Sequence, residues 1–278
     1  MKHIQFEIAV NDKTLTLGSD PIVMGILNTT PDSFSDGGKF EQIDLAIEQA
    51  QIMVQQGASI IDVGGESTRP KAKQTPIQTE LDRVIPLIKK LSQEDLNTLI
   101  SIDSYKALVA DQALQSGAHI INDVSGLQAE PEIADVAVLH NAPVMIMHWD
   151  KKRDHDKDII DEIKRFFDKS LHIANNAGLK ENQIILDPGF GFAKTLAENY
   201  EILRRFDELA TLGYPFICGT SRKSMIGNLL NIPLNERLSG TIATNILAYI
   251  KGAHIFRVHD VKENLQALQV TKATIYEK

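Results

Sequence analysis

The sequence has little of what marks secreted and membrane proteins. Cys218 is the single cysteine among 278 residues, so no disulfide can form within the chain, which fits a reducing compartment. No stretch approaches the roughly 18 uninterrupted apolar residues that a membrane-spanning helix needs. The start of the chain lacks the long apolar core of a signal peptide. We therefore expect a cytoplasmic protein with no membrane partner.

Positive charge and regularly spaced metal ligands are also lacking. The formal net charge is −8 at pH 7, which argues against general nucleic-acid binding. No cysteine and histidine cluster has the spacing of a zinc site. Residues 189–194 lack the third glycine of a dinucleotide fingerprint, and residues 219–224 lack a complete phosphate loop. We therefore expect the partner to be a small molecule.

A short pattern recurs along the chain: glycine, a short apolar run, then polar residues. It stands at residues 57–62, 117–123 and 252–257. Glycine suits the left-handed position just past the end of a helix. The β-branched run suits a strand that is buried on both faces of a parallel sheet. The repeat therefore predicts a unit of helix, glycine, buried strand and polar tip.

Eight copies of this unit follow a small N-terminal hairpin over 4–10 and 14–17. Strands are predicted over 22–27, 59–63, 99–102, 144–147, 184–186 and 216–218, with two more ending at 122–123 and at 257–260. Helices are predicted over 41–56, 79–91, 105–116, 131–140, 158–177, 196–211 and 235–250, and a last helix closes the chain.

The count and the length match a (β/α)8 TIM barrel, which typically takes about 250 residues. An open, doubly wound sheet is the alternative. Eight units without a linker or a shift in composition favour the barrel, as one α/β domain over residues 1–278. The hairpin within residues 1–20 is expected to cover the bottom of this barrel.

Active sites of such barrels lie at the C-terminal ends of the strands. The side chains at these ends are polar: Asn28, Arg69, Asp103, Asn122, His148, Asp187, Lys223, Arg257 and His259. The acceptors and the amide among them suit the donor-rich edge of a fused nitrogen heterocycle. The arginines and His259 suit phosphate, and the side-chain oxygen of Asn28 could hold Mg²⁺. Nucleotide or flavin phosphate binders would look similar.

Other polar or reactive residues are expected to be structural. Cys218 lies in an apolar strand and is interpreted as a buried hydrophobe. Residues 151–158 carry both signs of charge and predict a solvated loop. His3, His140, His155 and His172 lie away from the strand ends and are expected to be structural or on the surface.

At the strand ends the sequence resembles the dihydropteroate synthase family of pterin-binding barrels. The matching segments span the chain in the expected order: residues 24–38, 62–70, 101–104, 121–126, 187–192, 221–224 and 257–260. The resemblance implies the joining of 6-hydroxymethyl-7,8-dihydropterin pyrophosphate to p-aminobenzoate, which gives 7,8-dihydropteroate and pyrophosphate. It also implies Mg²⁺ as cofactor and a homodimer formed through the later barrel helices. Because an electron-rich dihydropterin can support a cation, we favour an SN1-like substitution.

The resemblance also implies roles for individual residues. The pterin site would comprise Asp103, Asn122, Asp187, Lys223, Phe192, Met147 and Gly219, and pyrophosphate would contact Thr68, Arg69, Arg257 and His259, with Asn28 on the metal. The p-aminobenzoate pocket would comprise Phe34, Pro70, Phe192 and Ser224. The catalytic set would be Arg257, His259, Lys223, Thr68, Arg69 and Asp36.

Two positions depart from the family pattern. The family often continues Met-His-Met-x-Gly after the fifth strand, where this chain has Trp149 and a charged run after His148. Ala193 stands where glycine is common. Two rival functions share the predicted pterin acceptors: a methyltetrahydrofolate-dependent methyltransferase and a non-catalytic pterin or phosphate binder. Neither has an evident use for both the leaving-group residues and a second-substrate pocket.

Overall fold

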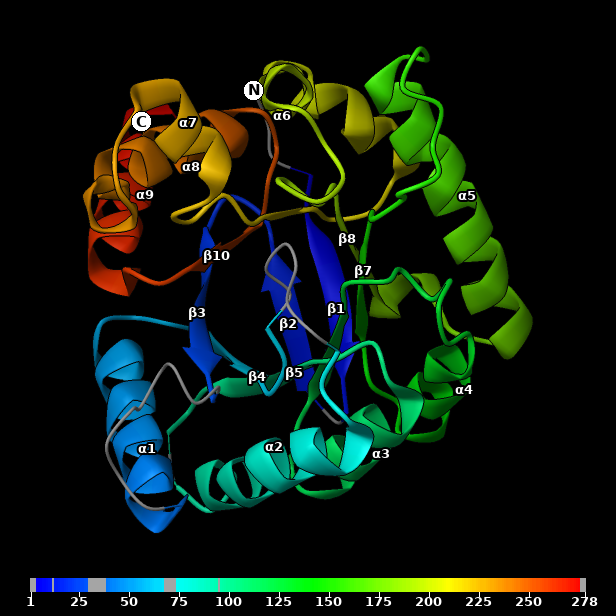
Figure 1. The fold of residues 1–278 in the computed structure, drawn as a ribbon, viewed down its shortest axis with the longest axis vertical. Coiled ribbons are helices and arrows are strands. Elements are labelled where there is room, and N and C mark those ends of the chain that lie inside the picture. Colours follow the sequence, from blue (N-terminus) through cyan, green and yellow to red (C-terminus); the bar gives the residue numbers. More distant parts are fainter. Residues whose placement is uncertain (1–3, 12, 30–38, 68–73, 95, 276–278) are drawn as a thin grey trace.

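Eight parallel strands form a barrel that is surrounded by helices, and a two-stranded antiparallel hairpin lies beside it (Figure 1). The computed structural model describes residues 4–11, 13–29, 39–67, 74–94 and 96–275. The hairpin consists of β1 (Phe6–Val10) and β2 (Lys13–Leu17). The barrel strands are β3 (Ile22–Asn28), β4 (Ile60–Gly64), β5 (Leu99–Asp103), β6 (Ile120–Asp123), β7 (Val144–Met147), β8 (Ile184–Asp187), β9 (Ile217–Cys218) and β10 (Ile255–Val258).

The α-helices follow the strands and form the outer ring. They are α1 (Lys39–Gln55), α2 (Ile77–Leu91), α3 (Ala107–Gln115), α4 (Glu132–Leu139), α5 (Ile159–Ala177), α6 (Leu196–Arg204), α7 (Ser224–Leu230), α8 (Leu238–Ile250) and α9 (Val261–Ile275). Short 3-10 turns are η2 (Glu181–Gln183), η3 (Phe206–Leu212) and η4 (Leu234–Glu236). None of the helices within the described ranges is long and apolar enough to cross a membrane.

The strand pairing confirms the predicted barrel and excludes the open sheet. The strand order is β8-β7-β6-β5-β4-β3-β10-β9, so the first and last strands of the barrel are hydrogen-bonded neighbours. The ring closes between β8 and β9 through a parallel bridge from Leu186 to Phe216, with the Leu186 amide donating to the carbonyl of Pro215 at 2.9 Å. This short seam contrasts with the longer ladders elsewhere.

The hairpin covers the N-terminal end of the barrel, as predicted. Its buried side chains Ile8, Val10 and Leu17 belong to one apolar cluster with residues at the strand starts: Met24, Ile60, Ile120, Met145, Ile185, Ile217 and Ile255. Burial of this layer favours the closed bottom through the hydrophobic effect. The polar strand ends are therefore left at the opposite end.

Glycines end the helices as the repeat predicts. Gly57, Gly117 and Gly252 have φ values of +100°, +109° and +101°, which a residue with Cβ adopts only with strain. At Gly117 a Cβ would also lie 2.4 Å from the Cβ of Ser92. The glycine thus serves both the turn and the close approach of two segments.

Two helix predictions were wrong in detail. The helix predicted over 196–211 ends at Arg204 and continues as the 3-10 turn η3. In a 3-10 turn residues three apart lie on one side, which lets Phe206 and Leu209 both become buried. The helix predicted over 235–250 begins at Leu238, and α7 before it was not predicted.

Candidate active site

Four neighbouring strands place polar or small residues at one level of the mouth. Asn28 of β3 is opposite Gly64 of β4, Gly64 is opposite Asp103 of β5, and Asp103 is opposite Asn122 of β6. Asp103 and Asn122 are nearly buried, at 8% and 4% exposure. The parallel register therefore brings together side chains that are distant in the sequence, as the strand-end argument predicts.

Arg257 of β10 lies at the centre of a buried ionic network. Its Nε donates to Oδ2 of Asp62 at 2.7 Å, and its Nη2 donates to Oδ2 of Asp103 at 2.7 Å. The side-chain amide of Asn122 donates to the same Asp62 oxygen at 3.1 Å. One guanidinium thus links a carboxylate predicted to bind pterin with a second carboxylate below it.

Burial and charge shift the titration of this network. Desolvation raises the pKa of Asp103 to about 7, although the Arg257 charge lowers it and the neighbouring Asp62 charge raises it. The pKa of Arg257 is raised further above its usual range, because Asp62 and Asp103 outweigh its burial. The site therefore pairs a permanent cation with a carboxyl group that titrates near neutral pH.

Asp187 and Lys223 form a second polar group beside this network. Asp187 ends β8 opposite Met147 of β7, and its Oδ1 accepts from the Gly189 amide at 2.7 Å. Burial raises the pKa of Asp187 and lowers that of Lys223 to about 8, with each charge partly offsetting the shift of the other. Gly219 leaves room between them, since a Cβ there would lie 3.7 Å from Asp187 Oδ2 and 3.8 Å from Lys223 Nζ.

Phe192 provides an aromatic surface next to this pair. The Nζ of Lys223 lies 4.6 Å from the centre of the Phe192 ring, and it also donates to the carbonyl of Phe190. Ser224 begins α7 directly after Lys223 and is exposed. The loop after β8 thus brings an aromatic ring next to the cation Lys223, which follows β9 and precedes Ser224 in the sequence.

His259 is held by Ser221 from the loop after β9. The backbone amide of His259 donates to Ser221 Oγ at 3.1 Å, and Ser221 Oγ lies 2.9 Å from His259 Nδ1. When the imidazole is neutral, the hydroxyl can donate to Nδ1, which leaves the proton on Nε2. Ser221 thus fixes the ring and can select its tautomer.

His148 does not take part in the mouth, contrary to the expectation from its place at a strand end. It is 0% exposed and packs edge-on against Phe166 of α5, with 4.8 Å between ring centres. Burial lowers its pKa to about 2, with help from the Lys194 charge. Its Nδ1 lies 2.8 Å from Lys194 Nζ, so a neutral imidazole accepts from the ammonium group.

Asn28 and Asp103 offer oxygens on either side of Gly64. A Cβ on Gly64 would lie 3.3 Å from Asn28 Oδ1 and 3.6 Å from Asp103 Oδ2. Such oxygen donors suit Mg²⁺, which commonly takes one or two protein ligands and completes its shell with waters and substrate phosphates. Within the described part of the chain, no three His, Cys, Asp or Glu residues are grouped as a metal cluster. The residues present fit an ion that a phosphorylated substrate helps to hold.

Five predicted site residues lie outside the described residues: Phe34, Asp36, Thr68, Arg69 and Pro70. The described residues on either side of 68–73 are tied to Lys106. Its Nζ pairs with Glu66 and with Glu80, and donates to the Thr75 carbonyl at 2.7 Å. Lys106 is only 2% exposed, so this is a buried anchor beneath the mouth.

Sequence reasoning missed Asp62 and Ser221 as site residues. Asp62 is 0% exposed, and its Oδ1 has no hydrogen-bond partner among the described residues. A carboxylate inside an otherwise apolar strand was the available signal, because a buried charge needs a partner. Ser221 gave no such signal, since serine is ordinary in a loop.

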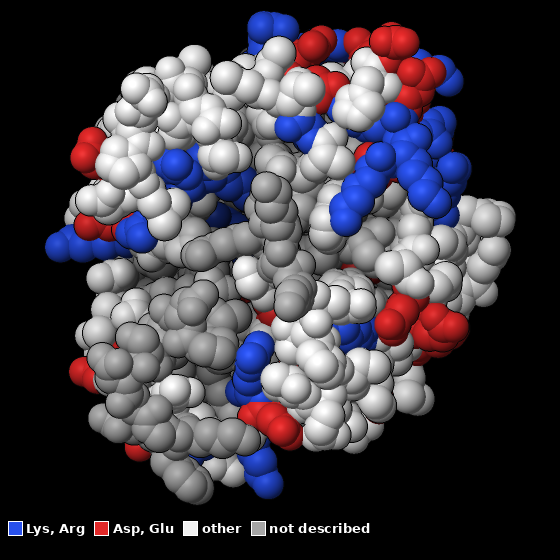
Figure 2. Space-filling model, in the orientation of Figure 1, with Lys and Arg blue, Asp and Glu red and all other residues white. Residues whose placement is uncertain are grey.

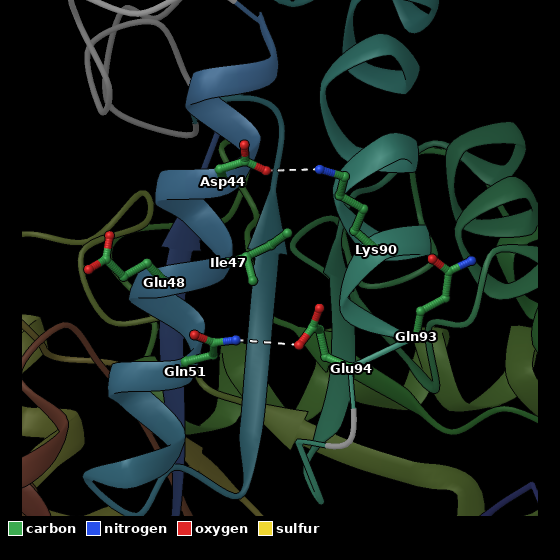
Figure 3. Close-up of a pocket in the computed structure, with 7 residues that line it drawn as sticks. All are labelled: Asp44, Ile47, Glu48, Gln51, Lys90, Gln93 and Glu94. Atoms are coloured by element: carbon green, nitrogen blue, oxygen red, sulfur yellow. Dashed lines mark hydrogen bonds and ion pairs between the residues drawn. The ribbon is translucent and has the colours of Figure 1, made fainter.

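The charge of the surface supports the mouth as the site. Basic side chains border the centre of the face seen in Figure 2 on several sides, although the chain is acidic overall. A hollow between α1 and α2 lies on the outer wall instead (Figure 3). It is bridged by Lys90 to Asp44 at 2.8 Å and Gln51 to Glu94 at 3.4 Å, and it contains none of the predicted site residues.

A known protein family and its curated members match most of the chain. A family model described as pterin binding enzyme matches residues 24–259. A dihydropteroate synthase from Clostridium beijerinckii is 45% identical over 263 residues, which cover 94% of this chain and 97% of the relative. A dihydropteroate synthase from a Synechocystis strain is 49% identical, covering 92% of this chain and 91% of the relative.

A solved structure gives the same result for the fold. The structure of Xanthomonas albilineans dihydropteroate synthase with 4-aminobenzoic acid superposes with a TM-score of 0.92 at 37% identity. The match covers 98% of this chain and 99% of that chain. The barrel, the hairpin and the strand ends are therefore compared over nearly their full extent.

Proposed function

We propose, from the premise that the chain belongs to the family of pterin-binding enzymes, that it catalyses the dihydropteroate synthase reaction. The substrates are 6-hydroxymethyl-7,8-dihydropterin pyrophosphate and p-aminobenzoate, and the products are 7,8-dihydropteroate and pyrophosphate. The observation that carries the proposal is the placement of Arg257 between Asp62 and Asp103, beside the Asp187 and Lys223 pair at the same mouth. A carboxylate that can accept hydrogen bonds from a heterocycle, Asp103, thus lies next to a cation that can stabilise a leaving group, Arg257.

The pterin is assigned to the deep end of the mouth. Asp103, Asn122 and Asp187 supply acceptors and an amide for its polar edge, and Lys223 supplies a donor. Met147 is 3% exposed at the end of β7, next to Asp187, and Gly219 leaves space there. With Phe192 these residues would enclose a flat ring between apolar and polar surfaces, as is usual for small-molecule sites.

Pyrophosphate is assigned to Arg257 and His259, with Thr68 and Arg69 of the second loop. A guanidinium next to the mouth can stabilise the negative charge that builds on the leaving group. His259 can donate a hydrogen bond through its Nε2 proton, in the tautomer that Ser221 favours. Asp36 of the first loop is assigned to the catalytic set on the resemblance alone.

Mg²⁺ is the proposed cofactor, with Asn28 as its protein ligand. The oxygens of Asn28 and Asp103 on either side of Gly64 support this assignment. When bound, the ion supplies positive charge that stabilises the departing pyrophosphate.

The p-aminobenzoate pocket is assigned to Phe192, Ser224, Phe34 and Pro70. The Xanthomonas structure contains 4-aminobenzoic acid, and the relative's fold matches this chain closely, which supports a second-substrate pocket at the same mouth. The exposed Ser224 lies after Lys223 at the start of α7. Because Ser224 is exposed and follows the pterin-assigned Lys223, it suits a ligand that binds nearer the solvent than the pterin does.

The proposed chemistry is a dissociative substitution. Cleavage of the C–O bond moves its electron pair to the pyrophosphate oxygen, and the electron-rich dihydropterin supports the positive charge left on the methylene carbon. The amine lone pair of p-aminobenzoate then forms the C–N bond, and that nitrogen loses one proton to solvent. An arylamine is neutral near pH 7, so the step requires no general base.

A homodimer through the later helices is also proposed. Four large apolar residues on the later helices are between 49% and 69% exposed: Leu229 and Leu230 of α7, Leu247 of α8 and Val270 of α9. These helices lie together on one flank of the barrel (Figure 1). Exposed apolar patches of this kind mark interaction surfaces.

Pyrophosphate release tests the proposed reaction. We expect release from the dihydropterin pyrophosphate that depends on p-aminobenzoate and on Mg²⁺, together with formation of dihydropteroate. Omission of each component is the control. Tight pterin binding without release would contradict the reaction while leaving the pterin pocket in place, and methyl transfer would be tested next.

A further inference from the structure

The loop after β7, where the sequence departs from the family pattern, is docked on the loop after β8. The Arg153 side chain is 0% exposed and pairs with Glu198 of α6. Its guanidinium also donates to the Ala193 carbonyl at 3.4 Å. Of the predicted solvated loop 151–158, Arg153 is thus the buried exception, because it joins the two loops.

Lys194 strengthens the same junction from the other side. Its Nζ donates to the Gly189 carbonyl at 2.8 Å and to the Phe192 carbonyl at 3.1 Å, and it reaches Nδ1 of His148 at 2.8 Å. The backbone on both sides of Phe192 is therefore fixed by a lysine that also contacts the end of β7. These contacts hold the backbone, and the orientation of the Phe192 ring depends on other contacts.

Trp149 provides the contact that orients the Phe192 ring. The two ring centres are 5.2 Å apart with an interplanar angle of 64°, a favourable edge-to-face arrangement. The Nζ of Lys151 lies 4.4 Å from the Trp149 ring centre, while Lys223 Nζ lies 4.6 Å from the Phe192 ring centre. An edge-to-face pair of indole and phenyl rings is therefore flanked by two lysines, one over each ring.

We propose that Trp149 is a positioning residue that sets the affinity for p-aminobenzoate by holding the Phe192 ring. This inference rests on the proposed function, which assigns Phe192 both to the p-aminobenzoate pocket and to the wall of the pterin pocket. The pterin is also assigned polar contacts with Asp103, Asn122 and Asp187, so the Phe192 ring should contribute a smaller share of its affinity. A benzoate ring has few polar groups, so its affinity depends more on an ordered aromatic wall.

The test compares Trp149→Ala with Trp149→Phe in steady-state assays of both substrates. Loss of a ring contact should raise the KM for p-aminobenzoate about three- to tenfold in Trp149→Ala. The KM for the dihydropterin pyrophosphate should change less, and kcat should change less than the KM for p-aminobenzoate. Trp149→Phe keeps a ring and should restore most of the affinity.

Tyr214→Ala is the matched control, because Tyr214 is a half-buried aromatic residue that precedes β9 at the closed end of the barrel. An unchanged KM for p-aminobenzoate in Trp149→Ala would overturn the proposal. Equal increases for both substrates, or an increase matched by Tyr214→Ala, would overturn it as well. Absence of turnover in the wild-type protein would instead refute the proposed function.

The wild-type protein offers an independent readout. Trp149 is the only tryptophan in the chain, so indole fluorescence excited at its red edge reports on this position once the emission of p-aminobenzoate alone is subtracted. Saturation with p-aminobenzoate and pyrophosphate should lower the quenching of this fluorescence by acrylamide. Quenching that does not change with saturation would overturn a role for Trp149 beside the bound ring.

Discussion

Arg257 connects the two halves of the proposed chemistry. Its guanidinium contacts Asp103, which is assigned to the pterin, and it is assigned to the pyrophosphate as well. We expect Arg257→Ala to lower turnover at least about 100-fold, since removal of one preorganised donor to a developing charge typically costs that much. Steady-state pyrophosphate release measures the effect, and near-normal turnover would refute the assigned role.

The same substitution has a structural side effect that a second variant separates. Without Arg257, the fully buried Asp62 keeps, among the residues that the structure describes, only the Asn122 amide as a partner. A buried charge that has lost its ionic partner can cost about 3–5 kcal/mol. The double variant Arg257→Ala/Asp62→Asn removes that charge. Its thermal stability should recover towards that of wild type while its turnover stays low.

Asp103 should make pterin binding depend on pH near neutrality. Its pKa is raised to about 7 by burial, so the acceptor carboxylate forms as the pH rises through 7. Affinity for a pterin analogue, measured by calorimetry between pH 6 and 8, should therefore increase with pH. The Asp103→Asn variant should lose this dependence, and an identical slope in both proteins would contradict the assignment.

The raised pKa of Asp103 also affects stability with a definite sign. In the folded state the group keeps a proton that it has already lost in the unfolded chain, where its pKa is the ordinary 3.8. The folded state therefore binds more protons between about pH 4 and 7, and the contribution of this group to stability falls as the pH rises through that window. The carboxylate is retained at a cost to stability, as expected of a functional group.

Lys106 couples three elements through one buried ammonium group. It joins the β5–α3 connection to Glu66 after β4 and to Glu80 of α2. Lys106→Met should leave the buried Glu80 and Glu66 carboxylates without their ammonium partner, although Tyr105 still donates to Glu66, and should destabilise the protein by about 3–5 kcal/mol. Urea unfolding measures this change.

Lys90→Met is the matched control for that substitution. Lys90 also pairs a helix with a neighbouring helix, but its side chain is 44% exposed and that of Asp44 is 68% exposed. Exposed pairs contribute about 0–1 kcal/mol, so the control should be nearly neutral. Equal effects of the two variants would mean that Lys106 is not the anchor that its burial indicates.

Elements were predictable where one pattern decided them. Glycine followed by a β-branched run fixes both a helix end and a buried strand, and this pattern marks β4, β6 and β10. The η3 turn and α7 were not predictable, because both are too short for periodicity to separate from a loop. Their conformation depends on tertiary contacts, such as the stacking of Phe206 against Phe190 with 6.3 Å between ring centres.

The residues at the strand ends could be predicted from the sequence, whereas their contacts with residues deeper in the barrel could not. Asp103, Asn122, Asp187 and Arg257 gather at the mouth because parallel strands share one direction. The pairing of Arg257 with Asp62 depends on register and side-chain reach, which sequence alone does not give. His148 occupies a strand end but faces α5, since a short strand can direct its last residue to either side.

On the scale of the whole molecule, the apolar flank of α7, α8 and α9 predicts self-association. We expect Leu229→Asp to shift the protein towards monomer, because it places a charge on a side chain that is 56% exposed within that flank. Sedimentation velocity over a range of concentrations measures the shift. Leu139→Asp, at the end of α4 and 75% exposed, is the control and should leave the oligomeric state unchanged.

The hairpin under the barrel has a consequence for the passage of molecules. Its side chains Ile8, Val10 and Leu17 share one apolar cluster with the first residues of the barrel strands, so they close the N-terminal end of the barrel. Reactants and products must then enter and leave through the opposite end. A pterin assigned to the deep end of such a one-ended site has to enter before p-aminobenzoate covers it, so the closed bottom predicts ordered addition of the two substrates.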